Sequence, residues 1–435
     1  MKVYKFGGTS VGLPERMHKV RDIITADGES KVVVLSAVSG TTNDLVRLSE
    51  YGAAGNRSDA DILLETLEKK YHVFITDLYK NKETKSEMKD FVRAKFEYLR
   101  KLSRSGANKE ILAQGELMST RLFHEMLLES GIRSQLVPAL DYMSIDEDRE
   151  PIVEQITQKL LPVLKNSDAE LFITQGFICL NHEGEIDNLE RGGSDYSASL
   201  VGAGISAEEV QIWTDIDGLH NNDPRIVKGT YPVAELSFDE AAELAYFGAK
   251  ILHPSSILPA QKFNIPVRLK STMNEEAAGT LISKRSVEGA VKAIAVKDGI
   301  TAIKIKSTRM LLAYGFLTRV FEVFEKHKTA IDMITTSEVA VSLTIDNSKH
   351  LAAIVAELEE FGWVDVDENQ SIVCVVGNMV SEQKGVVRKI FNALSDIPIR
   401  MVSYGGSRFN ISLLIDSSYR FEALNNLNTG LFEDL

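Results

Sequence analysis

The sequence contains little cysteine and no long hydrophobic run. Cys179 and Cys374 are the two cysteines among 435 residues, and each lies in an apolar segment. We therefore expect buried thiols in a reducing compartment, with neither a disulfide framework nor a cysteine-ligated zinc site. No apolar stretch reaches the roughly 18 residues that span a bilayer. The chain turns to Gly7 and Gly8 too early for a secretion signal, so a cytoplasmic protein is expected.

Positive charge and paired histidines are also scarce. The chain has 49 Lys and Arg against 62 Asp and Glu, a net charge of −13, which argues against binding to nucleic acid or an anionic membrane. The eight histidines show no metal-binding spacing, so we expect no histidine metal site. Apolar residues make up 44%, and the length suggests about three domains of roughly 150 residues.

The first two thirds of the chain alternate short β-branched runs with helical patterns, which is typical of an α/β sheet with crossover helices. The runs are apolar almost throughout, which indicates central strands covered on both faces. They lie at residues 3–6, 31–35, 171–175, 210–214 and 267–270. Between residues 45 and 113 the apolar positions recur at helical spacing instead. We expect one catalytic domain over residues 1–288, with this helical excursion inside it.

A repeat occupies the last third of the chain. Gly315 and Gly385 are about 70 residues apart, as are Asp346 and Asp416, and this period signals duplicated units. We predict two interleaved ferredoxin-like βαββαβ units over residues 299–369 and 370–435, the second completed by a strand at 290–297. On pattern alone, two unrelated α+β modules remain an alternative.

Two similar-looking motifs are rejected. Residues 202–207 match a dinucleotide-binding glycine pattern, but the preceding residues predict a helix where that motif needs a strand. Neither an HRD nor a DFG triplet occurs, which excludes a protein kinase.

Two glycine-containing loops follow predicted strands. Residues 5–12 carry Lys5, Gly7 and Gly8, and residues 35–43 carry Ser36, Gly40 and several other hydroxyl groups. Glycines allow backbone amides to approach an anion closely, and ligands of open α/β folds gather at such strand ends. The first loop is not a Walker loop, because Leu-Pro stands where Lys-Ser/Thr is required. For a single glycine loop, a structural turn remains an alternative.

Three further segments place charges together. Residues 191–195 combine Arg191, glycines and Asp195, and an arginine there can clamp a carboxylate. Residues 214–218 end a strand with two carboxylates, and Lys250 lies in an otherwise apolar segment. The alternatives are a solvated turn, an Asx-rich turn and a lysine that reaches to solvent.

In this order, the clusters resemble aspartate kinase of the amino-acid kinase superfamily. The matching segments are residues 5–11, 115–119, 191–195, 214–218 and 248–254. The likeness covers the whole chain, because the family carries two C-terminal ACT units. It implies a carbamate-kinase-like αβα sandwich followed by two ferredoxin-like ACT domains. Because the chain stops after the second repeat, we expect the monofunctional form rather than a fusion to homoserine dehydrogenase.

The resemblance implies transfer of the ATP γ-phosphoryl group to the side-chain carboxylate of L-aspartate. The product is 4-phospho-L-aspartate, in the first step toward lysine, threonine and methionine. A carboxylate with a pKa near 3.9 is already ionised at pH 7, so no general base is needed. Catalysis then consists of positioning and charge neutralisation, with ATP as co-substrate and Mg²⁺ bridging its phosphates.

The resemblance also assigns roles to individual residues. Lys5 neutralises the transferring group, and Asp195 orients Lys5 and the substrate amine. Arg191 clamps the α-carboxylate of aspartate. The residues assigned to aspartate are Thr42, Glu116, Arg191 and Ser194. Those assigned to ATP are Lys5, Gly7, Gly8, Ser36, Thr214, Asp215, Arg225 and Lys250. Family members often carry tyrosine where this chain has His220.

The ACT pair implies feedback control. Lysine-sensitive members of the family resemble this chain at Met310, Gly315, Phe316, Leu317, Asp332 and Ser337. Asp332 is the expected partner of an effector ammonium group, and lysine is expected to bind between ACT units of a homodimer. Its binding would shift the enzyme toward an inactive state.

Two alternatives are weighed. Another amino-acid kinase, such as glutamate kinase, is disfavoured by the paired ACT units and by Glu116. A catalytically silent amino-acid sensor is disfavoured because Lys5, Arg191 and Asp195 are all present.

Overall fold

The computed structural model describes residues 1–105, 107–189, 192–248, 252–285, 291–306 and 314–432. Contacts divide the chain into two compact units, each described by itself below. The first unit is Met1–Leu219 with Leu252–Lys284, and the second is His220–Ile251 with Arg285–Leu435.

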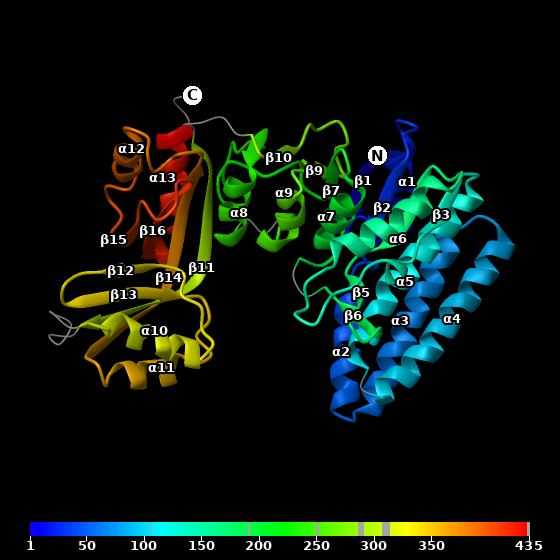
Figure 1. The fold of residues 1–435 in the computed structure, drawn as a ribbon, viewed down its shortest axis with the longest axis horizontal. Helices are drawn as coiled ribbons and strands as arrows, with labels where there is room; N and C mark the ends of the chain where they lie inside the picture. Colours follow the sequence, from blue (N-terminus) through cyan, green and yellow to red (C-terminus); the bar gives the residue numbers. More distant parts are fainter. Residues whose placement is uncertain (106, 190–191, 249–251, 286–290, 307–313, 433–435) are drawn as a thin grey trace. The chain divides into compact units, whose positions relative to one another are not determined.

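A mostly parallel sheet forms the centre of the first unit (Figure 1). Six strands are parallel to their neighbours, and the last strand of the series is antiparallel to the one beside it. In spatial order they are β3 (Ser134–Leu136), β4 (Leu171–Gln175), β2 (Lys31–Leu35), β1 (Lys2–Phe6), β7 (Val210–Thr214), β9 (Val267–Ser271) and β10 (Thr280–Ser283). The α/β class predicted from the alternating runs is thereby confirmed. The strands β2 and β4 are buried along their whole length, as continuous apolar runs require.

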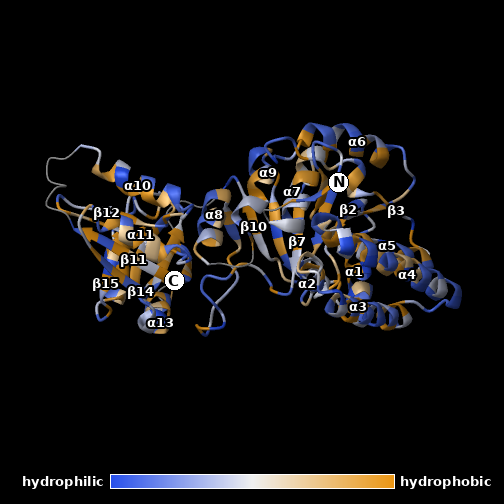
Figure 2. Ribbon diagram, turned by 90° about the horizontal axis from the view of Figure 1, so that it is seen from below, coloured by the Kyte–Doolittle hydropathy of each residue, from blue (hydrophilic) through white to orange (hydrophobic). Residues whose placement is uncertain are grey.

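Helices surround this sheet and bury their apolar stripes, which Figure 2 shows as orange on one face of otherwise blue helices. The helices are α1 (Pro14–Thr25), α2 (Thr41–Ala53), α3 (Arg57–Leu78), α4 (Lys82–Ser105), α5 (Asn108–Glu129), α6 (Val153–Lys165), α7 (Gly193–Ile205) and α9 (Leu258–Lys262), with short 3-10 turns η1 (Ala139–Asp141) and η2 (Pro254–Ile257). A small hairpin joins β5 (Ile178–Leu180) to β6 (Ile186–Asn188). The predicted helical excursion corresponds to α2 through α5, whose buried side chains share one core with β1 and β2.

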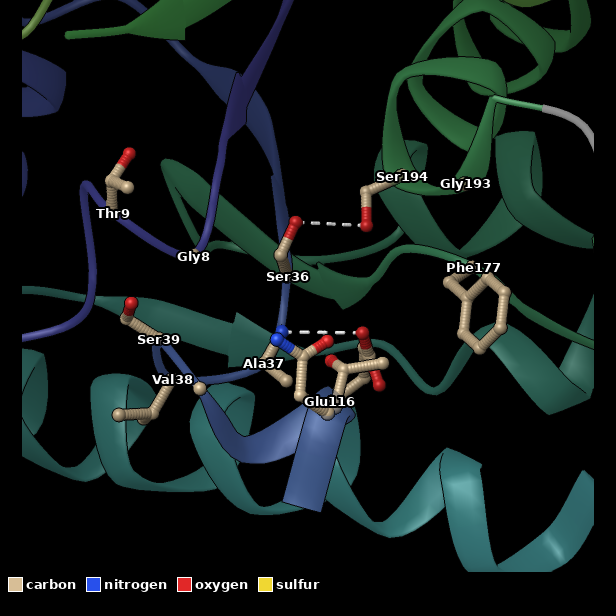
Figure 3. A pocket seen from close by; sticks show the side chains of 13 residues that line it. Gly8, Thr9, Ser36, Ala37, Val38, Ser39, Glu116, Phe177, Gly193 and Ser194 are labelled. Atoms are coloured by element: carbon tan, nitrogen blue, oxygen red, sulfur yellow. Dashed lines mark hydrogen bonds between the residues drawn. The ribbon is translucent and has the colours of Figure 1, made fainter. Parts of the chain in front are cut away.

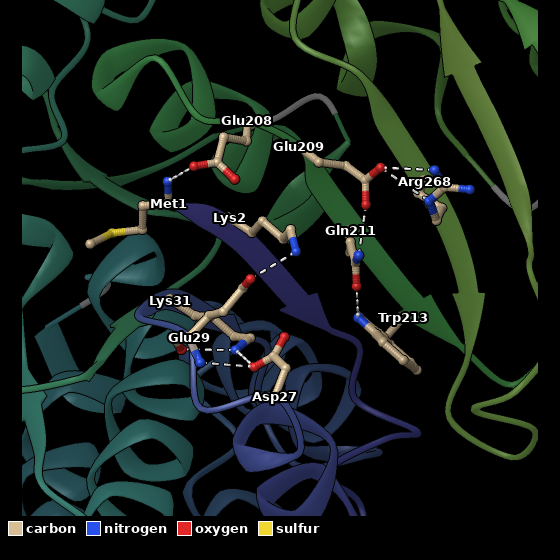
Figure 4. A network of polar contacts seen from close by, with 10 residues as sticks. All are labelled: Met1, Lys2, Asp27, Glu29, Lys31, Glu208, Glu209, Gln211, Trp213 and Arg268. Atoms are coloured by element: carbon tan, nitrogen blue, oxygen red, sulfur yellow. Dashed lines mark hydrogen bonds and ion pairs between the residues drawn. The ribbon is translucent and has the colours of Figure 1, made fainter.

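A network of ion pairs closes the amino-terminal end of the sheet (Figure 4). The N-terminal amine contacts Glu208 at 2.6 Å, and Lys2 contacts Glu29 at 2.8 Å. Lys31 is fully buried, and it pairs with Asp27 and donates to the Glu29 carbonyl. These contacts hold the amino-terminal ends of the strands in place. The pocket described below lies at the opposite, carboxyl ends of the same strands.

One continuous antiparallel sheet organises the second unit, in the order β12, β13, β11, β14, β16, β15. Its strands are β12 (Ile334–Thr336), β13 (Ala340–Ile345), β11 (Val291–Lys306), β14 (Trp363–Gly377), β16 (Asn410–Asp416) and β15 (Ile399–Ser403). The helices are α8 (Phe238–Tyr246), α10 (Phe316–Lys326), α11 (Leu351–Leu358), α12 (Val386–Ala393) and α13 (Arg420–Phe432), with β8 (Glu235–Ser237) leading into α8 and η4 (Ser417–Tyr419) into α13.

Two long strands are shared between the repeats. Residues 291–297 of β11 pair with 372–377 of β14, and 300–306 of β11 pair with 363–370. Each half of the sheet therefore has four strands, with its own core and its own pair of helices. The apolar pattern at residues 331–334 predicts a strand there, but in the structure β12 begins at Ile334. Asp332, two residues before it, accepts from Lys297.

Candidate active site

A pocket of about 420 Å³ lies at the carboxyl ends of β1, β2 and β4 (Figure 3). Three loops and the helices α2, α5 and α7 contribute to it, because parallel strands bring the loops that follow them to one edge of the sheet. The lining residues are Gly8, Thr9, Ser36, Ala37, Val38, Ser39, Gly40, Thr42, Asn43, Glu116, Phe177, Gly193 and Ser194. The two glycine-containing loops and the start of the 191–195 segment, separate in sequence, thus meet in one place.

The first two loops pack so closely that glycine is required. A Cβ atom on Gly12 would lie 2.7 Å from the side chain of Ser39, and one on Gly8 would lie 3.1 Å from the Ala37 carbonyl. Gly40 adopts a left-handed φ of 83° and begins α2. The loops are therefore held against each other, and Gly8 lies where its backbone faces the pocket.

An ion pair lies beside the first loop. The Lys5 Nζ is 2.6 Å from Oδ1 of Asp195, and both side chains are mostly buried. A Cβ on Gly7 would lie 3.4 Å from the Lys5 Nζ, so this cation is adjacent to the glycine loop. Asp195 is in the first turn of α7, where the helix dipole favours a negative charge. The arrangement fixes a positive group next to backbone amides.

The start of α7 also contacts the second loop. The Ser36 hydroxyl donates to Ser194 at 2.9 Å (Figure 3). A Cβ on Gly176 would collide with Ser194, which shows how tightly α7 sits on the end of β4. Helix N-termini carry unpaired amides and attract anions, so this corner suits a phosphate or carboxylate.

Glu116 is the pocket's buried carboxyl group. It is 3% exposed, its Oε1 accepts from the Ala37 amide at 3.2 Å, and its Oε2 has no hydrogen-bond partner in the described part of the chain. Burial raises the pKa of Glu116 to about 8, although the hydrogen bond from Ala37 lowers it somewhat. At neutral pH this carboxyl group is mainly protonated until a cation approaches Oε2.

The predicted site residues fall into three groups. The structure brings together Lys5, Gly7, Gly8, Ser36, Thr42, Glu116, Ser194 and Asp195 at the pocket or directly beside it. Thr214 ends β7, the neighbour of β1, and its hydroxyl donates to Asp215 at 3.1 Å; neither residue lines the pocket. Arg225 belongs to the second unit, is 77% exposed and binds Asp223. Arg191 and Lys250 lie outside the described residues.

The predicted effector residues lie in the second unit. Gly315 adopts φ 80° at the start of α10, Phe316 is buried, and Leu317 packs on the same core. Asp332 is 1% exposed, and the Ser337 amide donates to the Ala340 carbonyl at 2.8 Å. Met310 lies outside the described residues. His220, also in this unit, places Nδ1 2.9 Å from the Thr230 hydroxyl.

Sequence reasoning missed several residues at both places. In the pocket these are Thr9, Asn43, Phe177 and Gly193. Phe177 has a left-handed φ of 68°, which no pattern in the sequence announces. Around Asp332 the missed residues are Lys297 and Tyr246, which contact it from distant parts of the chain.

Among the described residues, no group of three or more His, Cys, Asp or Glu side chains could hold a metal ion. In the same residues, no helix is long and apolar enough to cross a membrane.

Comparison with known proteins gives matches over the whole chain. The amino acid kinase family model matches residues 1–271, and an ACT domain model matches residues 373–431. Lysine-sensitive aspartokinase 3 of Escherichia coli is 34% identical over 449 residues, covering 99% of this chain and 99% of that protein. The crystal structure of E. coli aspartokinase III with aspartate and ADP is similar at a TM-score of 0.84 with 34% identity, covering 99% of this chain and all of that one. The structure of the same enzyme with lysine and aspartate gives 0.83 with 33% identity, covering 99% of each chain.

Proposed function

The chain belongs to the aspartokinases of the amino acid kinase family, and on that premise we propose how its pocket phosphorylates L-aspartate. The activity is transfer of the γ-phosphoryl group of ATP to the side-chain carboxylate, giving 4-phospho-L-aspartate. The observation that carries the residue assignment is the Lys5–Asp195 ion pair of 2.6 Å beside the glycine loop, next to a pocket that is also lined by the buried carboxyl group of Glu116.

Charge neutralisation is the central requirement of this reaction. The acceptor carboxylate is ionised at neutral pH and needs no general base, but it must approach a polyanionic phosphate. Lys5 supplies the positive charge next to the backbone amides of Gly7 and Gly8, which donate hydrogen bonds to the oxygens of the transferring group. Asp195 holds Lys5 in place, so the cation is already positioned when the substrates arrive.

Aspartate binds on the Glu116 side of the pocket. Glu116 Oε2 is buried and unpartnered in the described residues, and it becomes the acceptor for the substrate ammonium group once the carboxyl group ionises. Thr42 and Ser194 line the same pocket and offer hydroxyl groups to the substrate. Arg191, whose position is outside the described residues, is assigned to the α-carboxylate through its motif. Asp195 is less suited to the ammonium group, because its charge already pairs with Lys5.

ATP is the second substrate, and Mg²⁺ comes with it. The described side chains form no three-ligand metal site, so the fit is to a metal carried mainly by phosphate oxygens. Bound with the nucleotide, Mg²⁺ supplies charge neutralisation at the phosphates. Ser36, Thr214 and Asp215 follow β2 and β7, the two strands that flank β1, and together with Arg225 and Lys250 they are assigned to the nucleotide. The E. coli relative has been crystallised with aspartate and ADP, which supports this pairing of substrates.

Lysine is the proposed feedback inhibitor. The E. coli relative is named lysine-sensitive and has been crystallised with lysine in a T state. In this chain Asp332 is a buried carboxylate next to the start of the first repeat, and the Oδ2 atom has no hydrogen-bond partner in the described chain. Residues Met310, Gly315, Phe316, Leu317 and Ser337 complete the proposed effector site. We assign a homodimer formed through the ACT units, in the cytoplasm, where the buried thiols Cys179 and Cys374 remain reduced.

A hydroxamate assay tests the substrate assignment. Acyl phosphates react with hydroxylamine, so purified protein with MgATP is offered aspartate, glutamate or N-acetylglutamate in separate reactions. We expect hydroxamate formation with aspartate, at least 100-fold faster than with the other two. Faster reaction with glutamate would identify a glutamate kinase, and no reaction with any acceptor would identify a silent sensor.

A further inference from the structure

Two donors converge on one oxygen of Asp332. Oδ1 accepts from the Lys297 ammonium at 2.7 Å and from the Tyr246 hydroxyl at 2.9 Å. Oδ2 is buried and finds no hydrogen-bond partner within the described residues. A buried carboxylate oxygen left without a donor is costly, so this atom is suited to a donor that arrives with a ligand.

The charged groups around Asp332 are not balanced and could be neutralised by one more cation. Lys297 contacts Asp346 at 2.8 Å as well as Asp332, so one ammonium group lies between two carboxylates. Burial lowers the pKa of Lys297, but its hydrogen bonds to both carboxylates outweigh burial and raise it above the usual value. Two carboxylates and one ammonium group carry a net charge of −1, which a ligand ammonium group at Oδ2 would neutralise.

Tyr246 links this cluster to helix α8. It is the last residue of that helix, and the Lys297 ammonium lies 4.5 Å from the centre of its ring. Burial, followed by the charge of Asp332, raises the pKa of Tyr246 to about 12, so the hydroxyl keeps its proton and remains a donor. An added ammonium group would compete with this donor for Asp332 and would repel Lys297.

Helix α8 has a second polar anchor, away from Asp332. Glu243 accepts from the Ser407 hydroxyl at 2.7 Å and also from the Asn410 amide, both in the second repeat. A capping box of Ser237 and Glu240 fixes the start of the helix. The helix is therefore fixed at its start and middle, and the contact at its end depends on the proposed effector carboxylate.

A close backbone contact directly after α8 requires glycine at position 248. A Cβ on Gly248 would lie 2.0 Å from the Val296 carbonyl, directly before Lys297 in β11. Beyond residues 249–251 the chain enters η2, where a Cβ on Gly192 would lie 2.2 Å from the Ser256 hydroxyl. Gly192 is the residue at which α7 begins, three positions before Asp195. The chain thus leads from Tyr246 to a segment that packs against the start of α7.

We propose that Tyr246 is the coupling residue between effector and catalysis: an ammonium group bound at Asp332 Oδ2 withdraws Oδ1 from the Tyr246 hydroxyl and releases the end of α8. The inference rests on the proposed regulation by lysine. In this proposal the Tyr246–Asp332 hydrogen bond stabilises the active state, so breaking it and binding lysine favour the same inactive state. Because such coupling is reciprocal, losing the hydroxyl must lower activity and tighten lysine binding together.

The test is Tyr246→Phe, which removes the hydroxyl and keeps the ring over Lys297. Lysine binding is measured by calorimetry, and activity by steady-state assay with and without lysine. We expect roughly tenfold tighter lysine binding, the lower end of what one hydrogen bond to a charged group contributes, with lower activity in the absence of lysine. Hydrogen exchange of the last turn of α8 should also rise without lysine. The matched control is Tyr419→Phe, since Tyr419 packs on the second repeat away from Asp332; it should match the wild type.

The outcomes separate the two proposals. Unchanged or weaker lysine binding by the Tyr246→Phe protein, beside a wild type that binds lysine and is inhibited by it, would overturn the coupling alone. Weaker binding would show that Tyr246 only orients Asp332. A wild-type enzyme that neither binds lysine nor responds to it would overturn the proposed regulation, and the coupling with it, while leaving the aspartate kinase assignment intact.

Discussion

Two of the buried carboxyl groups in this molecule lie in very different surroundings. Glu116 lines the pocket of the first unit and is 3% exposed, and the side chain of Asp332, in the second unit, is 1% exposed. In both, one oxygen is held and the other has no partner among the described residues. Glu116 is held by a neutral amide, whereas Asp332 is held by the ammonium group of Lys297. The two carboxyl groups therefore differ in whether an ammonium group of the protein itself pairs with them.

The difference explains how each group can serve its ligand. Without a nearby cation, burial keeps Glu116 mainly protonated at pH 7, so the empty pocket carries no buried charge there. It becomes charged only when a cationic group arrives. Asp332 has its cation permanently, and a ligand must therefore change an existing set of contacts. The first arrangement suits substrate binding, and the second suits a switch.

The largest expected effect concerns the pocket's own ion pair. In a Lys5→Ala protein the transferring phosphoryl group loses its adjacent cation, because alanine carries no ammonium group and Asp195 is left without its partner. We expect kcat to fall at least roughly 1,000-fold, as for removal of a group that stabilises transition-state charge. The steady-state assay should show an unchanged rate for the exposed control Lys101→Ala. A Lys5→Ala rate within tenfold of the wild type would contradict the catalytic assignment.

The next effect concerns stability. Lys297→Met removes the cation from Asp332 and leaves a buried carboxylate uncompensated, at a cost of about 3 kcal/mol in the free energy of unfolding. Urea denaturation measures this loss. The double variant Lys297→Met with Asp332→Asn should recover most of it, since the unpaired charge is then gone. Equal stability of the single variant and the wild type would show that Lys297 is not needed to compensate Asp332.

A smaller effect comes from matched amide substitutions. Glu116→Gln keeps the shape of the side chain but cannot become anionic, so KM for aspartate should rise about tenfold. Asp332→Asn should weaken lysine binding by a similar factor. KM for aspartate, from steady-state kinetics, and the affinity for lysine, from calorimetry, are measured for both variants. If Glu116→Gln altered lysine binding instead of KM, the two carboxyl groups would have been assigned to the wrong ligands.

A further expected effect is a pH dependence of stability. The pKa of Glu116 is about 8 in the folded protein against 4.5 for the ordinary group, so the folded state binds the extra proton. Its contribution is fully present below pH 4.5 and is lost as pH rises to about 8, with a slope of about 1.4 kcal/mol per pH unit. Glu116→Gln should lack this slope in urea titrations between pH 5 and 8. An identical slope in the variant would argue against a protonated Glu116.

Much of the fold could be predicted because short, continuous apolar runs indicate buried strands. The strands at 31–35, 171–175 and 210–214 have the limits that the apolar pattern gave them. The interleaving of the repeats was predicted from one unmatched strand, residues 290–297, of which residues 291–297 pair with 372–377 in the structure. The limits of β12 were not predicted: the apolar pattern starts at residue 331, whereas pairing with β13 starts at Ile334.

Of the residues that line the pocket, those in recognisable motifs could be predicted from the sequence. Gly8, Ser36, Thr42, Glu116 and Ser194 were named from motifs and line one pocket. No sequence pattern identified the two partners of Asp332. Lys297 lies in a strand, and Tyr246 ends a helix 86 positions away. A lysine or tyrosine in such places normally faces solvent. Only the folded chain shows that both reach the same oxygen.

Proton release on aspartate binding measures whether Glu116 is protonated in the empty pocket and ionises when the substrate ammonium group arrives. Calorimetric titration of aspartate at pH 6.5, in two buffers of different ionisation enthalpy, counts the protons released. The account predicts nearly one proton released per aspartate bound by the wild type, and none by Glu116→Gln. Binding of aspartate to the wild type without proton release would contradict it.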